Sequence, residues 1–331
     1  MRKAFVGFIT LATCVAFAVC LRPTERAAAQ PAALADVSIA VLGPSTGDWL
    51  MYIAQQQDFF AAEGLNVHVI TAGSPPNTTN LLASGSVNFM NNGTDSEIAA
   101  IAHQLPLKIV ASTFVTNPYT LVTAPSVTTW AQLRNKTITL GTKQDVTAIV
   151  LRRMAEAQHL DMDRDFSIVL GGTSAARFAA VSSGNVQGAI LTQPFDILAQ
   201  TQGMHVLAQA TTYLKSWVFS ALAVNTNWAS THRPEVVKYI RALRRAAQYG
   251  YTHRQEAVTA LVNVTHVDQS IAQRAYALDF GQWHAFSRTA QVDPRDLQAV
   301  MDAIVGIGIL PALVPVNAVL DPTYANEAAG S

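Results

Sequence analysis

The chain has 331 residues, carries 22 basic and 22 acidic side chains, and is half apolar. A chain of this size and apolarity can bury a large core, and its balanced charge gives no sign of a nucleic-acid-binding surface. The basic cluster Arg241, Arg244 and Arg245 lies in a pattern typical of the solvated face of an amphipathic helix, so no nucleic-acid partner is expected.

The N-terminus has the pattern of a secretory signal peptide. Two basic residues precede an apolar run from Ala4 to Leu21, and the small residues Ala27-Ala28-Ala29 offer a cleavage site. We therefore expect residues 1–29 to be a signal peptide and the mature protein to be periplasmic. A signal anchor is the alternative, because the apolar run is close to the shortest length that spans a bilayer.

Both cysteines, Cys14 and Cys20, lie in this leader. The mature chain would then have none, which excludes disulfides, thiolate metal sites and cysteine nucleophiles. Lipid attachment at Cys20 is not expected, because Val19 is bulkier than the small residue that normally precedes such a site. Without the leader, 18 basic and 21 acidic residues remain, a net charge of about −3.

From Val37 onward, short β-rich runs alternate with helical patterns, which predicts an α/β fold with mostly parallel sheets. The first block is expected to contain strand 37–42, helix 48–62, strand 65–71, a helix ending at Gly85, strand 87–90, helix 95–103 and strand 107–114.

The pattern then restarts. The second block is expected to contain a short helix near Trp130, strand 137–140, helix 145–158, strand 167–170, helix 174–183, strand 187–191 and helix 194–201. Extended segments at 119–123 and 217–224 join the blocks, so we expect two lobes with a two-strand hinge. The predicted boundaries are 36–118 for the first part of lobe 1, 119–216 for lobe 2, and 217–331 for the return to lobe 1 and the C-terminal helices.

One α/β unit occurs twice. LLASGSVNFMNNGTDSE begins at Leu81 and AVSSGNVQGAILTQPFD begins at Ala180, and their Ser-Gly pairs, at Ser84 and Ser183, are 99 residues apart. Each copy places a polar turn and a helix start after a strand, where open parallel sheets bind ligands. The sequence therefore predicts a ligand cleft between two similar halves.

The turns after the strands supply the candidate ligand contacts. Hydroxyl residues start six helices, Ser45 and Thr142 among them, and each fits ordinary capping as well as ligand binding. Free N–H groups at such starts suit an oxyanion or a carbonyl. The candidate ligand-binding residues are Thr46, Gly47, Asp48, Trp49, Ser74, Asn92, Gly93, Thr94, Asp95, Thr142, Lys143, Asp145, Thr173, Ser174, Thr192, Gln193 and Trp217.

Acidic residues in these turns leave the charge of the ligand open. If Asp48, Asp95 and Asp145 cap their own helices, they say nothing about the ligand, whereas an acid in the cleft would favour an N–H donor or a cation. Lys143 is the cation within the turns, and Arg177 is either a surface residue or a cleft residue.

Trp49 and Trp217 lie near strand ends or the hinge, and each could either stack on a ligand or pack in the core. Nucleophile-elbow, phosphate-loop, dinucleotide-binding and zinc-protease motifs are absent, and the histidines are scattered. We therefore expect no catalytic residues, no metal site and no cofactor.

The chain resembles the solute-binding proteins of ABC importers for nitrate, sulfonates, taurine and thiamine-pyrimidine precursors. The resemblance runs from Val37 to about Tyr324 and includes AQQQDFFAAEGLNV, LVTAPSVTTWAQLRNKTITLGT, VLGGTSAARFAAVSSGNVQGAILTQPFD and FSALAVNTNWA. It implies a type II periplasmic binding fold, with ligand contacts in turns 45–49, 73–74, 91–95, 141–145, 171–174 and 191–194. These turns contain no arginine, which departs from what a strongly anionic ligand such as nitrate would need.

The resemblance also implies a function. An exported substrate-binding protein of this type holds a small polar solute, such as a sulfonate, carboxylate or pyrimidine, and delivers it to a permease and ATPase complex in the inner membrane. Two alternatives stay open: a ligand-sensing ectodomain or adaptor for a signalling partner, and a pyrimidine-synthase-like or lyase-like enzyme on the same fold. The enzyme alternative is not favoured, because the fungal pyrimidine synthases imply cysteines in the body that this chain lacks.

Overall fold

The computed structural model describes Met1, Ala4, Gly7 and residues 33–330. The chain divides into two units with the boundary after Ala33, and the helices and strands described below lie in the second unit. The predicted cleavage site and Cys20 lie outside the described residues. Within the described part, no helix combines the length and apolar character that crossing a bilayer requires.

Five strands form the first sheet, in the order β2-β1-β3-β10-β4. β1 runs parallel to β2 and β3, whereas β10 is antiparallel to both β3 and β4. The sheet is thus mixed, because β10 enters it from the opposite direction. The strands are β1 (Ala35–Val41), β2 (Leu65–Thr71), β3 (Phe89–Gly93), β4 (Leu107–Phe114) and β10 (Ser220–Asn225).

The second sheet repeats this topology, in the order β7-β6-β8-β5-β9. β5 occupies the place that β10 has in the first sheet and is antiparallel to both of its neighbours. The strands are β5 (Thr120–Thr123), β6 (Thr137–Leu140), β7 (Ser167–Leu170), β8 (Gly188–Leu191) and β9 (His205–Gln209). β9 was not predicted. The predicted repeat is also visible in the backbone, since Gly85 and Gly184 both turn the chain with φ of +76°.

The helix predicted over residues 48–62 is in fact three short pieces: η1 (Thr46–Asp48), α1 (Trp49–Gln56) and α2 (Phe59–Ala62). Asp58 adopts a left-handed conformation, with φ of 54°, which ends one helix before the next begins. The other helices of the two sheets are α3 (Pro75–Ala83), α4 (Thr94–Ala102), α5 (Trp130–Leu133), α6 (Val146–Glu156), α7 (Met162–Asp165), α8 (Ser174–Ser182) and α9 (Phe195–Thr201), with a short turn η2 (Ala210–Thr212).

C-terminal helices surround the first sheet. α11 packs on α1 and α16, α12 on α1, and α14 on α4, while α13 also touches α9 of the second lobe. They are α10 (Thr226–Ala229), α11 (Arg233–Thr252), α12 (Arg254–Thr265), α13 (Gln269–Tyr276), the π-helical segment η3 (Ala277–Gln282), α14 (Pro294–Gly306), α15 (Val316–Val319) and α16 (Thr323–Ala329).

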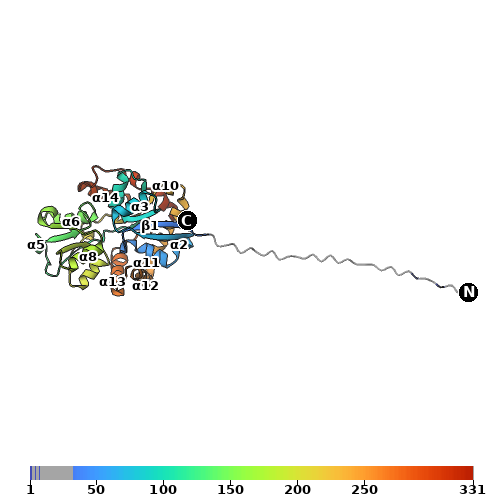
Figure 1. Ribbon diagram of the computed structural model, residues 1–331, viewed down its shortest axis with the longest axis horizontal. Coiled ribbons are helices and arrows are strands. Elements are labelled where there is room, and N and C mark those ends of the chain that lie inside the picture. Colours follow the sequence, from blue (N-terminus) through green and yellow to red (C-terminus); the bar gives the residue numbers. More distant parts are fainter. Residues whose placement is uncertain (2–3, 5–6, 8–32, 331) are drawn as a thin grey trace. The chain divides into compact units, whose positions relative to one another are not determined.

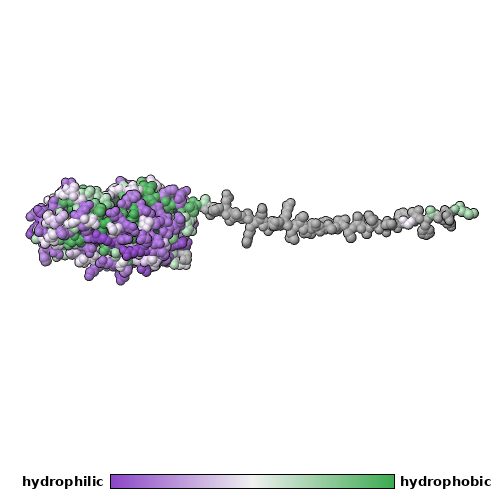
Figure 2. All heavy atoms as spheres, turned by 90° about the horizontal axis from the view of Figure 1, so that it is seen from below, coloured by the Kyte–Doolittle hydropathy of each residue, from purple (hydrophilic) through white to green (hydrophobic). Residues whose placement is uncertain are grey.

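The two lobes are visible in Figure 1, with α5, α6 and α8 (green and yellow) on the left and β1, α2 and α3 (blue to cyan) on the right. The chain crosses between them after Phe114 and returns before Ser220. Phe219 N donates to Phe114 O at 2.8 Å, so the two crossings run side by side there. The predicted two-lobe fold with a double connection is confirmed. Hydrophilic side chains cover much of the face drawn in Figure 2, with apolar ones scattered between them.

Candidate ligand-binding site

The turns that follow β1 and β3 in the first lobe touch the turns that follow β6 and β8 in the second. Thr46 N and Oγ1 lie 3.5 and 3.4 Å from Gln193 O, and Val146 N donates to Asp95 Oδ2 at 2.9 Å. We call this contact the inter-lobe seam. It lies at the strand ends where the sequence predicts ligand binding.

Asp95 reaches across the seam to the start of α6, besides interacting with N–H groups of its own helix. Its carboxylate accepts from the first N–H of α6, while Asp145, the N-cap of α6, accepts from Thr147 and Ala148. The N–H groups expected to be free at this helix start are therefore occupied by two carboxylates. Burial, and next the nearby Asp145, raise the pKa of Asp95 to about 7.

Arg177 is a buried cation of the second lobe, with a side chain only 2% exposed. Its guanidinium donates to three neutral oxygens, namely Ile190 O at 2.6 Å, Ser174 Oγ at 2.9 Å and Gly172 O. None of the ion pairs in the described part of the chain includes Arg177. A guanidinium has five N–H donors, so it can still bind an acceptor.

Two glycines make room for this guanidinium. A Cβ at Gly171 would lie 2.8 Å from Arg177 Cγ, and a Cβ at Gly141 would lie 3.3 Å from its Nη1 and 2.3 Å from Asp145 Oδ2. The turns lack arginine in sequence, yet an arginine from within α8 reaches them. Of the two roles left open for Arg177, a surface residue or a cleft residue, its burial excludes the exposed surface position.

Aromatic rings from the hinge stand beside these groups. Tyr119 and Phe219 pack edge to face at 5.4 Å, and the Arg177 guanidinium lies 5.8 Å from the centre of the Tyr119 ring. Both rings are half-buried. Burial raises the pKa of the Tyr119 phenol, so it stays protonated and can donate a hydrogen bond.

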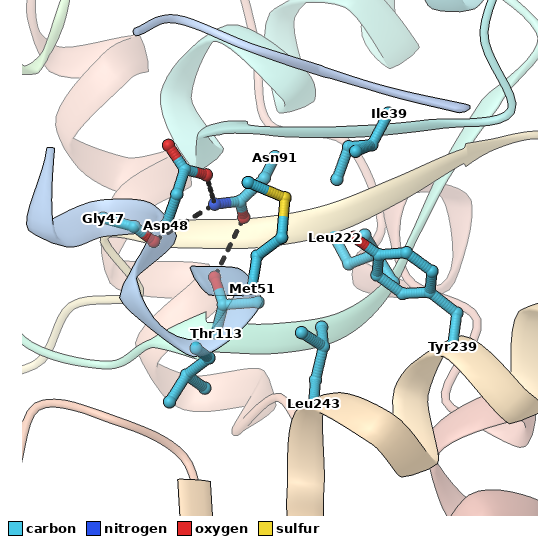
Figure 3. Close-up of a pocket in the computed structure, with 10 residues that line it drawn as sticks. Ile39, Gly47, Asp48, Met51, Asn91, Thr113, Leu222, Tyr239 and Leu243 are labelled. Atoms are coloured by element: carbon cyan, nitrogen blue, oxygen red, sulfur yellow. Dashed lines mark hydrogen bonds between the residues drawn. The ribbon is translucent and has the colours of Figure 1, made fainter. Parts of the chain in front are cut away.

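Asp48 lies deeper in the first lobe (Figure 3). Its carboxylate accepts from Asn91 Nδ2 at 2.6 Å, and Asn91 Oδ1 accepts from Thr113 at 2.9 Å. These groups line a cavity of about 10 Å³ together with Gly47 and Tyr239. That volume suits about one water molecule and is too small for an organic solute. Burial raises the pKa of Asp48 to about 7.

Three of the six predicted hydroxyl caps are confirmed. Ser45, Ser74 and Thr173 each accept a backbone N–H at a helix start. The remaining three hydroxyls have other partners: Thr94 donates to Val218 O, Thr142 accepts from Gln144 N, and Thr192 pairs with Ser174. In place of Thr142, the Asp145 carboxylate caps α6, whereas Thr94 and Thr192 are engaged by the returning segment and by Ser174.

Both candidate tryptophans lie in the core. Trp49 is fully buried, donates from Nε1 to Ala257 O at 2.7 Å, and meets the Phe280 ring edge to face at 5.2 Å. Trp217 is 2% exposed and belongs to the core that surrounds α6 and α14. Of the two alternatives, the structure favours core packing for both rings.

The remaining candidates are spread out. Asn92 binds Thr78 at 2.9 Å inside the first lobe, and Lys143 is exposed in its turn. A Cβ at Gly93 would lie 2.5 Å from Asp95 Oδ1, so this glycine gives room to the carboxylate that crosses the seam.

Two acids at the seam were not among the predicted contacts. Asp196 follows Gln193 in the quoted repeat, and its carboxylate accepts from Thr120 and from Gln193, both at 3.0 Å. Asp279 comes from η3, more than 200 positions after Thr46, and lies beside it. No local motif could have identified Asp279. Within the described residues, no group of three or more His, Cys, Asp or Glu side chains is arranged to hold a metal ion.

Comparisons with known proteins agree with this architecture. The YtlA protein of Bacillus subtilis (strain 168) is 22% identical over 287 residues, which are 84% of this chain and 85% of that protein. The ligand-binding component of an ABC-type import system from Staphylococcus aureus has a TM-score of 0.77 at 12% identity, covering 90% of this chain and 100% of that one. The periplasmic nitrate-binding protein NrtA from Synechocystis PCC 6803 has a TM-score of 0.76 at 16% identity, covering 90% of this chain and 89% of that one.

The predicted periplasmic binding fold is thus confirmed, and it is the fold of substrate-binding components of ABC importers. A family model described as "NMT1/THI5 like" matches residues 48–257, which is well over half of the chain. The chain therefore belongs to the NMT1/THI5-like family.

Proposed function

We propose that this protein is exported to the periplasm, binds a small polar organic solute at the inter-lobe seam, and delivers it to a permease and ATPase complex of an ABC importer. The proposed closing unit has a first lobe made of residues 36–118 and 217–331 and a second lobe made of residues 119–216. No bond is made or broken in this proposal.

The proposal rests on the surroundings of the buried Arg177 side chain. The hydrogen-bond partners of its buried guanidinium named above are neutral oxygens, and Asp145, though nearby, forms no ion pair with it; a buried charge is costly unless it is paired and hydrogen-bonded. A sulfonate, carboxylate or heterocyclic carbonyl of the solute would use the remaining N–H donors. Tyr119 and Phe219 would pack the rest of the solute, in place of the two tryptophans.

Closure follows from the double connection. Only the segments around Phe114 to Tyr119 and Tyr213 to Phe219 need to change φ and ψ for the lobes to separate, so each lobe can move as a rigid body. The hydrogen bond between Asp95 and Val146 would then open and close with the solute.

Thermal unfolding with a panel of sulfonates, carboxylates and pyrimidines tests the proposal. A solute at about a hundredfold its dissociation constant should add about 2.7 kcal/mol of stability, enough to raise Tm by a few degrees. The same solute should reduce the radius of gyration in X-ray scattering. A panel that changes neither quantity contradicts the proposed function.

A further inference from the structure

A second group of polar side chains at the seam differs in chemistry from the surroundings of Arg177. Gln193 stands at its centre: its carbonyl oxygen contacts Thr46 of the first lobe, and its Nε2 donates to Asp196 at 3.0 Å. Asp279, carried by the π-helical segment η3, lies beside Thr46 and interacts electrostatically with Asp196. Both lobes therefore contribute to this group.

Some of its acceptors lack well-formed hydrogen bonds. Gln193 Oε1 is buried without a hydrogen-bond partner, and neither Asp279 Oδ1 nor Oδ2 has a partner in good hydrogen-bond geometry, although the Thr46 hydroxyl lies close enough to Asp279 to lower its pKa; both side chains are 0% exposed. Buried polar atoms in proteins nearly always have well-formed hydrogen bonds, so acceptors without them on two side chains of the seam call for an explanation. These acceptors could take further donors, which is what a ligand with N–H groups supplies.

The charged side chains near Asp196 and Asp279 also favour a cationic ligand group. The closest cation from the neighbouring helices, Arg274 on α13, is exposed and donates to Gln200 Oε1 at 2.9 Å. No ion pair of the described residues involves Asp196 or Asp279. Asp196 and Asp279, from opposite lobes, therefore interact without an ion-paired cation, although Arg274 acts on Asp196 through its charge and lowers its pKa.

We propose that Asp279 and Gln193, supported by Asp196, form a subsite for a protonated amine or similar cationic N–H group of the bound solute. This inference rests on the proposed function, which it sharpens. The solute would be bipolar, with an acceptor group at Arg177 and an N–H donor group at Asp279. Burial and the nearby Asp196 raise the pKa of Asp279, and a bound cation would reverse that effect.

Matched probe pairs test the subsite. The pairs are 4-aminobutyrate and butyrate, 2-aminoethanesulfonate and ethanesulfonate, and 4-aminopyrimidine and pyrimidine, measured by calorimetry at pH 7. In at least one of the first two pairs, whose amines are protonated at this pH, the aminated member should bind about tenfold more tightly or better, as expected for a buried charge pair. Asp279→Asn should remove that preference, and Asp302→Asn, which neutralises an exposed acid on α14, should keep it.

Equal affinities within every pair that binds, or a preference that survives in Asp279→Asn, would overturn the subsite while leaving the proposed function in place. Failure of all six probes and of the wider panel to bind would overturn both.

A measurement without any ligand gives an independent answer. Because the Asp279 carboxylate is buried without a well-formed hydrogen bond, Asp279→Asn should raise the Tm of the ligand-free protein at pH 8, where Asp302→Asn should leave it unchanged. A lower Tm in Asp279→Asn would mean that the carboxyl group has a structural role. That result would contradict the proposed subsite even before a solute is known.

Discussion

Asp95 of the first lobe accepts a 2.9 Å hydrogen bond from the N–H of Val146, the first residue of α6 in the second lobe. A carboxylate at a helix N-terminus is stabilised by the helix dipole, so this contact holds the two lobes together. It also occupies the N–H group that an acidic solute would otherwise use. In the closed form, an acceptor group of the proposed solute would therefore need other donors, such as the Arg177 guanidinium.

Asp95→Ala should weaken closure. Without the carboxylate, the open form gains population, and the ligand-free radius of gyration in X-ray scattering should rise. Asp95→Asn keeps an acceptor oxygen and should change the radius less. Asp163→Asn, an exposed acid on α7, serves as the control. An unchanged radius in Asp95→Ala would show that this hydrogen bond does not hold the lobes.

Arg177→Met should both destabilise the protein and abolish solute binding. The substitution leaves Ile190 O and Gly172 O without their donor, which should lower the free energy of unfolding by roughly 2–4 kcal/mol. Arg177→Lys should not restore binding, because an ammonium cannot reproduce the planar fork. Urea unfolding and calorimetry measure the two effects, with the exposed Arg153→Met as control. Full affinity in Arg177→Lys would exclude a fork-shaped contact with the solute.

Local sequence patterns were enough to predict much of the fold. Strands 65–71 and 107–114 have the bounds that periodicity predicts, and Ser74 and Thr173 cap the helices α3 and α8. These features depend on neighbours a few residues away. The site depends on distant ones: Thr94 bonds Val218 O from the returning hinge segment, and Asp279 reaches the seam only through the packing of the C-terminal helices. No short motif encodes such contacts.

Stability should fall as pH rises from 5 to 8. Burial raises the pKa of Asp48, Asp95 and Asp196 to about 7, above the value of 3.8 in the unfolded chain. The folded state then keeps protons that the unfolded state has released, so this stabilisation is complete below about pH 4 and is lost as pH passes 7. Tm at constant ionic strength measures the effect. Asp48→Asn should flatten the slope, and a Tm that rises over this range would refute the raised pKa values.

Gly171→Ala should disturb the site through sterics alone. Its Cβ would lie 2.5 Å from Thr139 Oγ1 and 2.8 Å from Arg177 Cγ, so the arginine side chain must shift. This shift should lower the free energy of unfolding by about 1–3 kcal/mol. Gly306→Ala is the matched control, because a Cβ there meets nothing within 4 Å. It should leave stability unchanged or increase it by up to about 1 kcal/mol. Equal unfolding midpoints for the two variants would mean that Gly171 is not needed for space.

Substitutions of Trp49 distinguish a role in core packing from a role in ligand stacking. Because its ring is buried among Tyr276, Phe280 and Phe286, Trp49→Ala should lower the free energy of unfolding by roughly 3–5 kcal/mol. Trp49→Phe loses the hydrogen bond to Ala257 O but fills more of the space, so its loss of stability should be smaller than that of Trp49→Ala.

In either variant, the solute affinity of the folded fraction should change little, since the Trp49 ring does not reach the seam. Urea unfolding followed by calorimetry on the same samples measures both, with the half-buried Trp130→Phe as control. Normal stability together with lost affinity in Trp49→Phe would instead assign the ring to the solute.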